Sequence, residues 1–157
     1  MSDIWLYDSL IQDNNHFTYP TAPTYSPNGL VLNSTGLLNH TLPDKYAIEF
    51  EITNRPNVPS NQHCDGWYWE YIRMWLWQNN GVIQKGTSWT EVTNSAPNFN
   101  TNDIVRLEYD NDTNTAKYYV NDVLKYTITG VTQNKEFRLW KQGTVRVTFK
   151  NLKIREL

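Results

Sequence analysis

Short segments in which apolar and polar residues alternate recur along the chain, and no segment keeps an apolar period of 3.6 residues. In residues 46–53, apolar side chains occupy every even position from Ile48 to Ile52, with Glu49 and Glu51 between them. Successive side chains of a strand point to opposite faces, so this segment is predicted to be a strand with one apolar face. The pattern as a whole predicts an all-β protein.

Turn-forming residues separate the expected strands. Asn121 and Asp122 predict a tight hairpin turn, because Asn and Asp tolerate the positive φ that such turns require. In residues 144–154 the apolar positions change parity, which predicts a bulge or bend near Asn151. Strands are expected at residues 4–7, 30–32, 36–38, 46–53, 67–77, 82–85, 104–110, 116–120, 123–128, 137–140 and 144–154, with extended loops at 19–29 and 55–66.

The number and spacing of these strands predict two packed sheets. The chain has 157 residues, enough to bury a core, and we interpret residues 1–157 as one β-sandwich domain. Cys64 is the sole cysteine, so an internal disulfide is excluded and stability has to come from packing.

The segment at residues 67–77 is unusually aromatic and holds four of the seven tryptophans. If it is one strand, its side chains divide by parity into two faces. One face carries Tyr68, Glu70, Ile72, Met74 and Leu76, and the other carries Trp67, Trp69, Tyr71, Arg73, Trp75 and Trp77. The first set resembles an ordinary core face, whereas the second is bulky and contains a cation. We therefore expect the second set on the outside of the sandwich.

A contiguous exposed aromatic patch usually marks a binding site. Flat rings beside hydrogen-bonding groups suit a sugar, whose faces are apolar and whose edges carry hydroxyls. The pattern thus predicts a carbohydrate platform made of Trp69, Tyr71, Arg73 and Trp75, with Trp67 and Trp77 at its edges. The alternative is that these tryptophans fill the core, because Trp is highly buried on average.

Further residues are candidates for the same platform. Trp140 shares its parity with Arg138 and opposes Phe137 and Leu139, so it is expected on the outer face. Trp89 is isolated, and it either caps a core edge or lies in a binding loop. Glu49 and Glu51 are predicted to hydrogen-bond ligand hydroxyls, and Arg73 to bind hydroxyls, a carboxylate or a phosphate.

Catalysis is the first alternative function. Side chains two apart on a strand are about 7 Å apart at the backbone, and inverting glycosidases need carboxyls about 6.5 to 9.5 Å apart. The spacing of Glu49 and Glu51 therefore does not exclude catalysis, but these are the only two acids on this strand face. We predict binding without catalysis. A structural or protein-interaction β-sandwich is the second alternative.

Neither a metal nor a cofactor is expected. Residues 110–114 have oxygen ligands at the spacing that opens a calcium loop, but they lack the following Gly and the distal Glu, so a turn is predicted. His63, Cys64 and Asp65 have no second His or Cys nearby, which favours a loop with a partly buried thiol.

Charge and hydropathy restrict the partners. The formal net charge is -2 and the basic residues form no stripe, so nucleic-acid binding is not expected. No apolar run approaches the roughly 18 to 20 residues that span a bilayer, so membrane insertion is not expected. The first residues lack the pattern of a signal peptide, which indicates a protein assembled inside a cell or a domain of a longer chain.

The C-terminal part resembles a known family. IVRLEY at residues 104–109, a turn, and AKYYVNDVL at residues 116–124 resemble the strand, turn, strand and Tyr-x-Asn-Gly signature of concanavalin A-like domains. Asp122 stands where that signature has Gly, which the turn tolerates. FKNLKI at residues 149–154 is similar to the last strand of that family. The resemblance covers the last third of the chain well and implies a two-sheet antiparallel jelly-roll β-sandwich with one concave sheet.

The family includes legume-type lectins, laminin G-like modules, glycosidases and carbohydrate-binding modules of bacteriophage tail and baseplate proteins. The phage modules fit best, because they are small, near neutral in charge, rich in Asn and Thr, and free of disulfides. The resemblance therefore implies a polysaccharide-binding adhesion module on a virion or extracellular surface. Shallow sugar sites are weak individually, so we expect several copies in a larger assembly.

Overall fold

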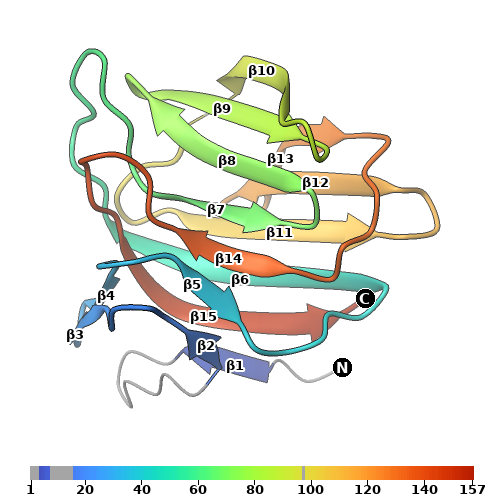
Figure 1. Ribbon diagram of the computed structural model, residues 1–157, viewed down its shortest axis with the longest axis horizontal. Coiled ribbons are helices and arrows are strands. Elements are labelled where there is room, and N and C mark those ends of the chain that lie inside the picture. The colour runs from blue at the N-terminus through green and yellow to red at the C-terminus, as the bar shows by residue number, and fades with distance from the viewer. Residues whose placement is uncertain (1–3, 8–15, 97) are drawn as a thin grey trace.

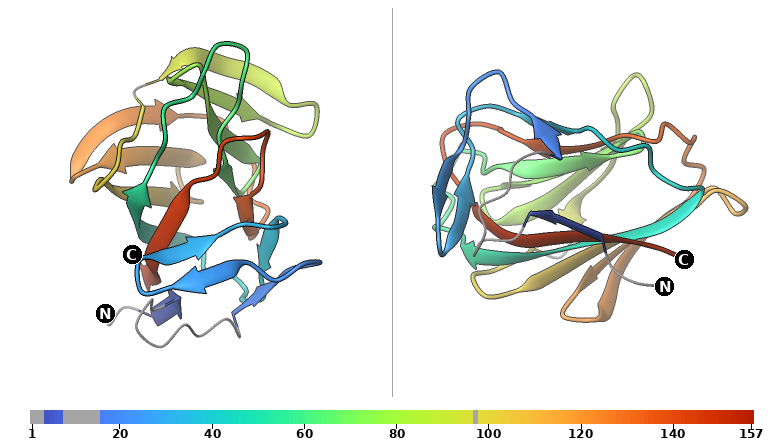
Figure 2. Two further views of the ribbon diagram at one scale, coloured as in Figure 1. Left: turned by 90° about the vertical axis from the view of Figure 1, so that its left-hand side faces the viewer. Right: turned by 90° about the horizontal axis from the view of Figure 1, so that it is seen from below.

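The computed structural model describes residues 4–7, 16–96 and 98–157 (Figure 1). These residues form fifteen β-strands and no helix. Within them, accordingly, no helix is long and apolar enough to cross a membrane. The strands form two antiparallel sheets packed face to face, as Figures 1 and 2 show, so the predicted all-β sandwich is confirmed.

One sheet, called here the eight-stranded sheet, lies behind the other in Figure 1. Its strands, in spatial order, are β13 (Val123–Ile128), β12 (Thr115–Val120), β11 (Ile104–Asp110), β6 (Lys45–Asn54), β15 (Thr148–Glu156), β4 (Gly29–Val31) and β3 (Thr24–Ser26), and β1 (Ile4–Tyr7) pairs with β15. The sheet brings the first and last strands of the chain together.

The other sheet, called the seven-stranded sheet, lies in front in Figure 1. In spatial order its strands are β10 (Thr90–Ala96), β9 (Asn80–Lys85), β8 (Ile72–Trp77), β7 (Gly66–Trp69), β14 (Phe137–Trp140), β5 (Gly36–Leu38) and β2 (Phe17–Thr18). Sequence reasoning missed β2 and β10 entirely, and it placed β3 inside a loop.

The core lies between the two sheets and is largely aromatic. In β6, Ile48, Phe50 and Ile52 are buried, as their alternation predicts. The Phe50 ring packs edge-on against the Trp67 ring, with centroids 5.1 Å apart at 67°. Phe50 also meets Phe149 of β15 at 5.6 Å. Edge-to-face pairs of this kind are favoured by the ring quadrupoles.

Two local predictions are confirmed. Asn121 and Asp122 connect β12 and β13 with φ of 51° and 63°, the positive values that a two-residue hairpin needs. The pairing of β15 with β6 shifts register between Lys150 and Lys153, and Asn151 has φ 53°. A bulge at that point lets both halves of β15 direct apolar residues into the core.

The predicted strand at residues 67–77 is wrong, because it is a hairpin. Glu70 and Tyr71 form a two-residue turn between β7 and β8, and Glu70 has φ 54°. Trp69 therefore pairs with Ile72, and Trp67 pairs with Met74. Cross-strand partners share a face, so both tryptophans join the core instead of the outer surface.

Candidate functional site

The outer face of the seven-stranded sheet contains a hollow of about 240 Å³ lined by aromatic and arginine side chains. Its lining residues, called here the aromatic pocket, are Thr35, Tyr68, Arg73, Trp89, Arg138 and Trp140. Strand β7 contributes Tyr68, β8 contributes Arg73, and β14 contributes both Arg138 and Trp140. Trp89 lies in the turn between β9 and β10. The pocket is thus assembled from segments that are far apart in the sequence.

Sheet register explains why the polar members of the pocket meet. Tyr68 pairs with Arg73 on one side and with Arg138 on the other. Because cross-strand partners share a face, these three side chains form one row directed away from the core. Gln84 of β9 extends this row, since it pairs with Arg73.

A glycine makes room for the aromatic part of the pocket. Gly66 of β7 pairs with Trp140, and a Cβ atom at Gly66 would lie 1.9 Å from the backbone oxygen of Met74 and 3.0 Å from the Cα of Trp75. With no side chain between them, the rings of Trp75 and Trp140 meet edge to face, 5.3 Å apart at 84°. Trp75 is only 6% exposed, so its ring packs against Trp140 as a largely covered neighbour.

Arg73 is held by both a hydrogen bond and rings. Its Nε donates to Oε1 of Gln84 at 2.6 Å. Its guanidinium carbon lies 4.2 Å from the ring centroid of Trp89 and 5.2 Å from that of Trp140. These are cation–π distances. Partial burial lowers the pKa of Arg73 from its usual value, although an arginine stays charged at neutral pH.

Arg138, the second cation of the pocket, has a carboxylate partner. It forms an ion pair with Glu136, to which its Nε also donates at 2.7 Å. Its guanidinium carbon lies 5.3 Å from the Tyr68 ring centroid. Nδ2 of Asn134 donates to the Tyr68 hydroxyl at 3.0 Å and to Glu136 Oε2 at 2.9 Å. Burial, and then the charge of Glu136, raises the pKa of Tyr68.

The buried side chain of Glu70 holds the segment that carries Asn134 and Glu136 in place. Glu70 is fully buried and accepts hydrogen bonds from the Tyr46 hydroxyl at 2.9 Å, from the Lys135 amide at 2.8 Å and from the Asn134 amide. Its own amide donates to the carbonyl of Glu136 at 2.9 Å. The turn that ends β7 thus fixes the segment leading into β14.

Trp89 is placed over the pocket by a strained turn. Its amide donates to the Gly86 carbonyl at 3.2 Å, and its φ is 53°. A bulky residue with positive φ is uncommon. The ring of Trp89 packs edge-on against Tyr68, with centroids 5.4 Å apart at 67°. Backbone strain at such a residue is a frequent property of functional positions.

The predicted platform residues are only partly together. Arg73 and Trp140 line the pocket, and Trp75 contacts Trp140 without lining it. Trp77 is at the other end of β8, where its ring lies 4.2 Å from that of His63. Tyr71 lines a separate hollow of about 210 Å³. The parity prediction for Trp140 is confirmed.

The prediction of an exposed role is wrong for two residues, Trp67 and Trp69. Both have no exposed surface. The turn at Glu70 and Tyr71 reverses the chain, which transfers them to the face of Ile72. They therefore cannot stack on a ligand in the folded protein.

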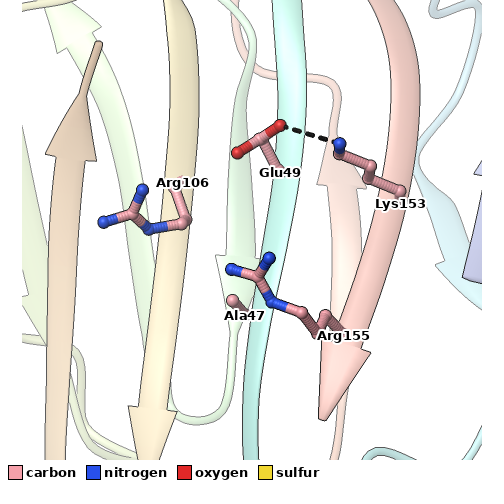
Figure 3. A pocket seen from close by; sticks show the side chains of 5 residues that line it. All are labelled: Ala47, Glu49, Arg106, Lys153 and Arg155. Carbon is pink, nitrogen blue, oxygen red and sulfur yellow. Dashed lines mark ion pairs between the residues drawn. The ribbon is translucent and has the colours of Figure 1, made fainter. Parts of the chain in front are cut away.

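The placement of Glu49 and Glu51 beside the aromatics is also wrong. Both lie on β6, in the outer face of the eight-stranded sheet. Figure 3 shows Glu49 between Arg106 and Lys153, with its carboxylate 3.3 Å from Lys153 Nζ. Glu51 accepts a hydrogen bond from Asn151 at 3.3 Å. Because the two outer faces point apart, these glutamates cannot orient a ligand in the aromatic pocket.

Tyr68 and Arg138 were missed because the hairpin was missed. The parity of one long strand assigns Tyr68 to the core, whereas it is half-buried in the pocket. Two signals were available. Strands are usually 3 to 10 residues long, and the segment at 67–77 exceeds that length. The charged residue Glu70 also interrupts the face that was expected to be apolar.

The candidate metal and nucleophile groups show structural roles. Asp110 ends β11 and Asp112 lies in the turn that follows, and both form ion pairs with Lys45, at 3.5 and 2.6 Å. Burial raises the pKa of Cys64 to about 12. His63 Nδ1 accepts a hydrogen bond from Trp75 Nε1 at 2.7 Å. Among the residues that the structure describes, no three His, Cys, Asp or Glu side chains are grouped to hold a metal ion.

No protein-family model matches the sequence, and no curated protein resembles it significantly in sequence. Solved structures do match its fold. The carbohydrate-binding module CBM66 from Bacillus subtilis has a TM-score of 0.60 and 10% sequence identity, over 90% of this chain and 96% of that one. This near-complete match confirms the predicted jelly-roll β-sandwich.

Botulinum neurotoxin structures match as well. One, of the type C toxin whose cell entry depends on interaction with two ganglioside molecules, has a TM-score of 0.54 and 14% identity over 99% of this chain and 43% of that one. The binding domain of botulinum neurotoxin DC in complex with SialylT has a TM-score of 0.52 and 14% identity over 90% and 42%. The chain spans less than half the length of these toxin structures, and the likeness establishes the shared fold.

Proposed function

We propose that this protein is a carbohydrate-binding module that holds a sugar in the aromatic pocket without transforming it. One observation carries the proposal: a hollow of about 240 Å³ in which Tyr68, Trp89 and Trp140 stand beside two arginines. Aromatic rings stack on the apolar faces of a sugar, and fixed donors at their edges bind its hydroxyls. Binding sites of this kind combine an apolar lining with a few placed polar groups.

The polar groups around the rings are already oriented. Gln84 holds Arg73, and Asn134 holds the Tyr68 hydroxyl at 3.0 Å. A ligand therefore meets side chains that need little reordering, which lowers the entropic cost of binding. The pocket is smaller than the roughly 300 to 1,000 Å³ of sites that enclose drug-sized ligands, so it suits one sugar ring.

The lining of the pocket is unsuited to glycoside hydrolysis. Glycosidases use two carboxyl groups on either side of the scissile bond. None of the side chains that line the pocket carries a carboxyl, and the nearby Glu136 is paired with Arg138. Glu49 and Glu51 lie on the opposite sheet, where Glu49 pairs with Lys153. Binding without turnover is the chemistry that these side chains support.

The structural neighbours are consistent with this role. CBM66 is a carbohydrate-binding module of nearly the same extent as this chain, and the type C toxin interacts with gangliosides. In this proposal the chain serves as an adhesion module of a bacteriophage tail or another surface, present in several copies. Multivalency then compensates for a weak single site.

Tryptophan fluorescence during titration with cell-wall polysaccharides and oligosaccharides tests the proposal. We expect one glycan to protect an exposed tryptophan population from acrylamide saturably, while the glycan remains chemically unchanged. Trp140→Ala should lower the affinity by about 1 to 3 kcal/mol, because it removes a stacking ring. Tyr119→Ala is the matched control, since this ring stacks on Arg106 on the opposite sheet.

The contrary results are distinct. Release of shortened or unsaturated products would show an enzyme. No response to any glycan, together with capture of a protein by the same face, would show a protein-interaction domain. Equal affinity of Trp140→Ala and the unchanged protein would remove the pocket from the binding site.

A further inference from the structure

The two arginines of the aromatic pocket differ in their charge balance. Arg138 forms an ion pair with Glu136. Arg73 forms no ion pair with any carboxylate of residues 16–96 and 98–157. It is the cation of the pocket whose charge the described part of the protein leaves uncompensated.

Arg73 is also partly removed from water. It lies between the rings of Trp89 and Trp140, at 4.2 and 5.2 Å. Withdrawing a cation from water is costly unless another charge or dipole compensates it. The faces of the rings compensate part of that cost. A ligand anion would compensate the rest, and its attraction to this partly desolvated cation would be stronger than between the same charges in bulk water.

The guanidinium of Arg73 lines the hollow and keeps donors that the described residues do not use. Its Nε is occupied by Gln84, at 2.6 Å. Its two Nη groups have no hydrogen-bond acceptor within the described ranges. The hydrogen bond and the flanking rings fix the plane of the guanidinium. A planar fork of this kind binds a carboxylate through two parallel hydrogen bonds.

We propose that the aromatic pocket selects an acidic sugar, and that Arg73 binds its carboxylate while Trp140 and Trp89 contact the ring. The inference rests on the proposed carbohydrate-binding function and names the class of sugar. Uronic acids and sialic acids share this chemistry, and both are included in the test.

Charge and size together favour a single carboxylate. One uncompensated cation matches one negative charge, whereas a phosphate monoester carries about −1.5 to −2 at neutral pH. Glu136 lies next to Arg138 as its ion-pair partner, and its negative charge disfavours an anion of higher charge. The hollow of about 240 Å³ suits one sugar residue, so the acidic residue is recognised within a longer chain.

The sharpest test changes the ligand and leaves the protein intact. Oligosaccharides of galacturonate, glucuronate and mannuronate, and a sialylated trisaccharide, are each compared by calorimetry with the same compound after reduction of its carboxyl groups. We expect reduction to weaken binding of the preferred compound by about 10- to 100-fold, the range for hydrogen bonds to a charged group. Added salt should weaken binding of the acidic compound more than binding of the reduced, neutral compound.

A pair of variants assigns the effect to Arg73. Arg73→Gln should reduce affinity for the acidic compound by a similar factor and affinity for the reduced compound by less, so that the preference for the acidic form is lost. Arg106→Gln is the control, because Arg106 also stacks on an aromatic ring, that of Tyr119, but on the other sheet. Thermal unfolding of both variants verifies that they fold. If Arg73→Gln fails to fold, the comparison of acidic and reduced compounds on the unchanged protein still tests the inference.

The outcomes separate this inference from the proposed function. One outcome would overturn the acidic selection while the binding function stands. In it, the protein binds acidic and reduced compounds equally, Trp140→Ala abolishes this binding, and Arg73→Gln retains it. Binding of sulfated or phosphorylated chains without any carboxylated one would overturn the carboxylate assignment. No binding of any compound, acidic or neutral, would overturn both.

Discussion

The guanidinium carbon of Arg73 lies 4.2 Å from the ring centroid of Trp89, although Arg73 is on a central strand and Trp89 is in a turn at one end of the sheet. The turn directs the indole back over the sheet, where it also packs against Tyr68. Trp89 adopts φ 53° to do so. Because its backbone is strained, a substitution that relaxes the turn should raise stability. Because its ring contacts the pocket, removal of the ring should lower binding.

Replacement of Trp89 by Gly and by Ala should separate those effects. Both variants remove the ring, so both should lose about 1 to 3 kcal/mol of sugar affinity by calorimetry. Gly adopts positive φ readily, whereas Ala does not, so Trp89→Gly should be about 1 kcal/mol more stable than Trp89→Ala in urea unfolding. The reverse order of stability would show that the turn relaxes when the ring is removed.

Trp69 and Trp140 should respond differently to truncation. Trp69 has no exposed surface, so Trp69→Ala should lower the free energy of unfolding by about 3 to 5 kcal/mol through the cavity it leaves. Trp140 is half-buried on the outer face, and Trp140→Ala should cost less stability and more affinity. Denaturant unfolding and glycan titration of both variants check this. Equal losses of stability would contradict the assignment of Trp69 to the core.

Glu70 should be essential to the hairpin at the centre of the site. Glu70→Ala leaves the Tyr46 hydroxyl and the amides of Asn134 and Lys135 without their acceptor. Buried groups left unpaired are costly, so we expect a loss on the order of 3 kcal/mol in urea unfolding. Glu91→Ala, at an exposed position of β10, is the control and should change stability by less than about 0.5 kcal/mol.

Asp65 should make stability depend on pH. It is fully buried, accepts hydrogen bonds from the amides of Gln142 and Val147, and pairs with Arg146. Burial outweighs the charge of Arg146 and raises the pKa of Asp65 to about 6 from its usual 3.8. The folded state therefore holds this proton more tightly than the unfolded state does.

The resulting stability is fully present below pH 3.8 and is lost as the pH rises through about 6. For a difference of about two pKa units, the loss is at most about 3 kcal/mol. Urea unfolding between pH 4 and 7 measures it against Asp65→Asn, which should lack this component. A wild-type curve that rises through this range relative to the variant would show that Arg146 dominates instead.

Cys64 should be chemically inert in the folded protein. Burial raises the pKa of its thiol to about 12, and the thiolate is the reactive form. A thiol reagent at pH 8 should therefore leave the native protein unlabelled and label one site per chain in denaturant, since the sequence has one cysteine. Rapid labelling of the native protein would indicate that the segment around Cys64 opens easily.

Local pattern was sufficient for much of the architecture. Alternation in β6 identified Ile48, Phe50 and Ile52 as core residues, and the parity change in β15 located the bulge at Asn151. Asn121 and Asp122 identified their turn because these residue types tolerate positive φ. Parity on β14 also placed Trp140 on the outer face. Each of these features depends on residues close together in the chain.

The aromatic pocket depended on tertiary structure. Glu70 and Tyr71 are not residues that mark a turn, and the turn is held by Tyr46 and by the amides of Asn134 and Lys135, which are distant in sequence. That reversal decided which aromatic residues face outward. The order of strands in the sheets also placed Glu49 on the eight-stranded sheet, away from the pocket on the seven-stranded sheet.

The sequence by itself therefore determined the all-β class, the core faces of the regular strands and the outward position of Trp140. Tertiary structure decided that Trp69 is core, that Tyr68 lies beside Arg73, and that Trp89 covers them. The physical reason is that side-chain parity is a local property of an extended chain. The point at which a chain reverses without Gly, Pro or Asn is decided by hydrogen-bond partners from other segments.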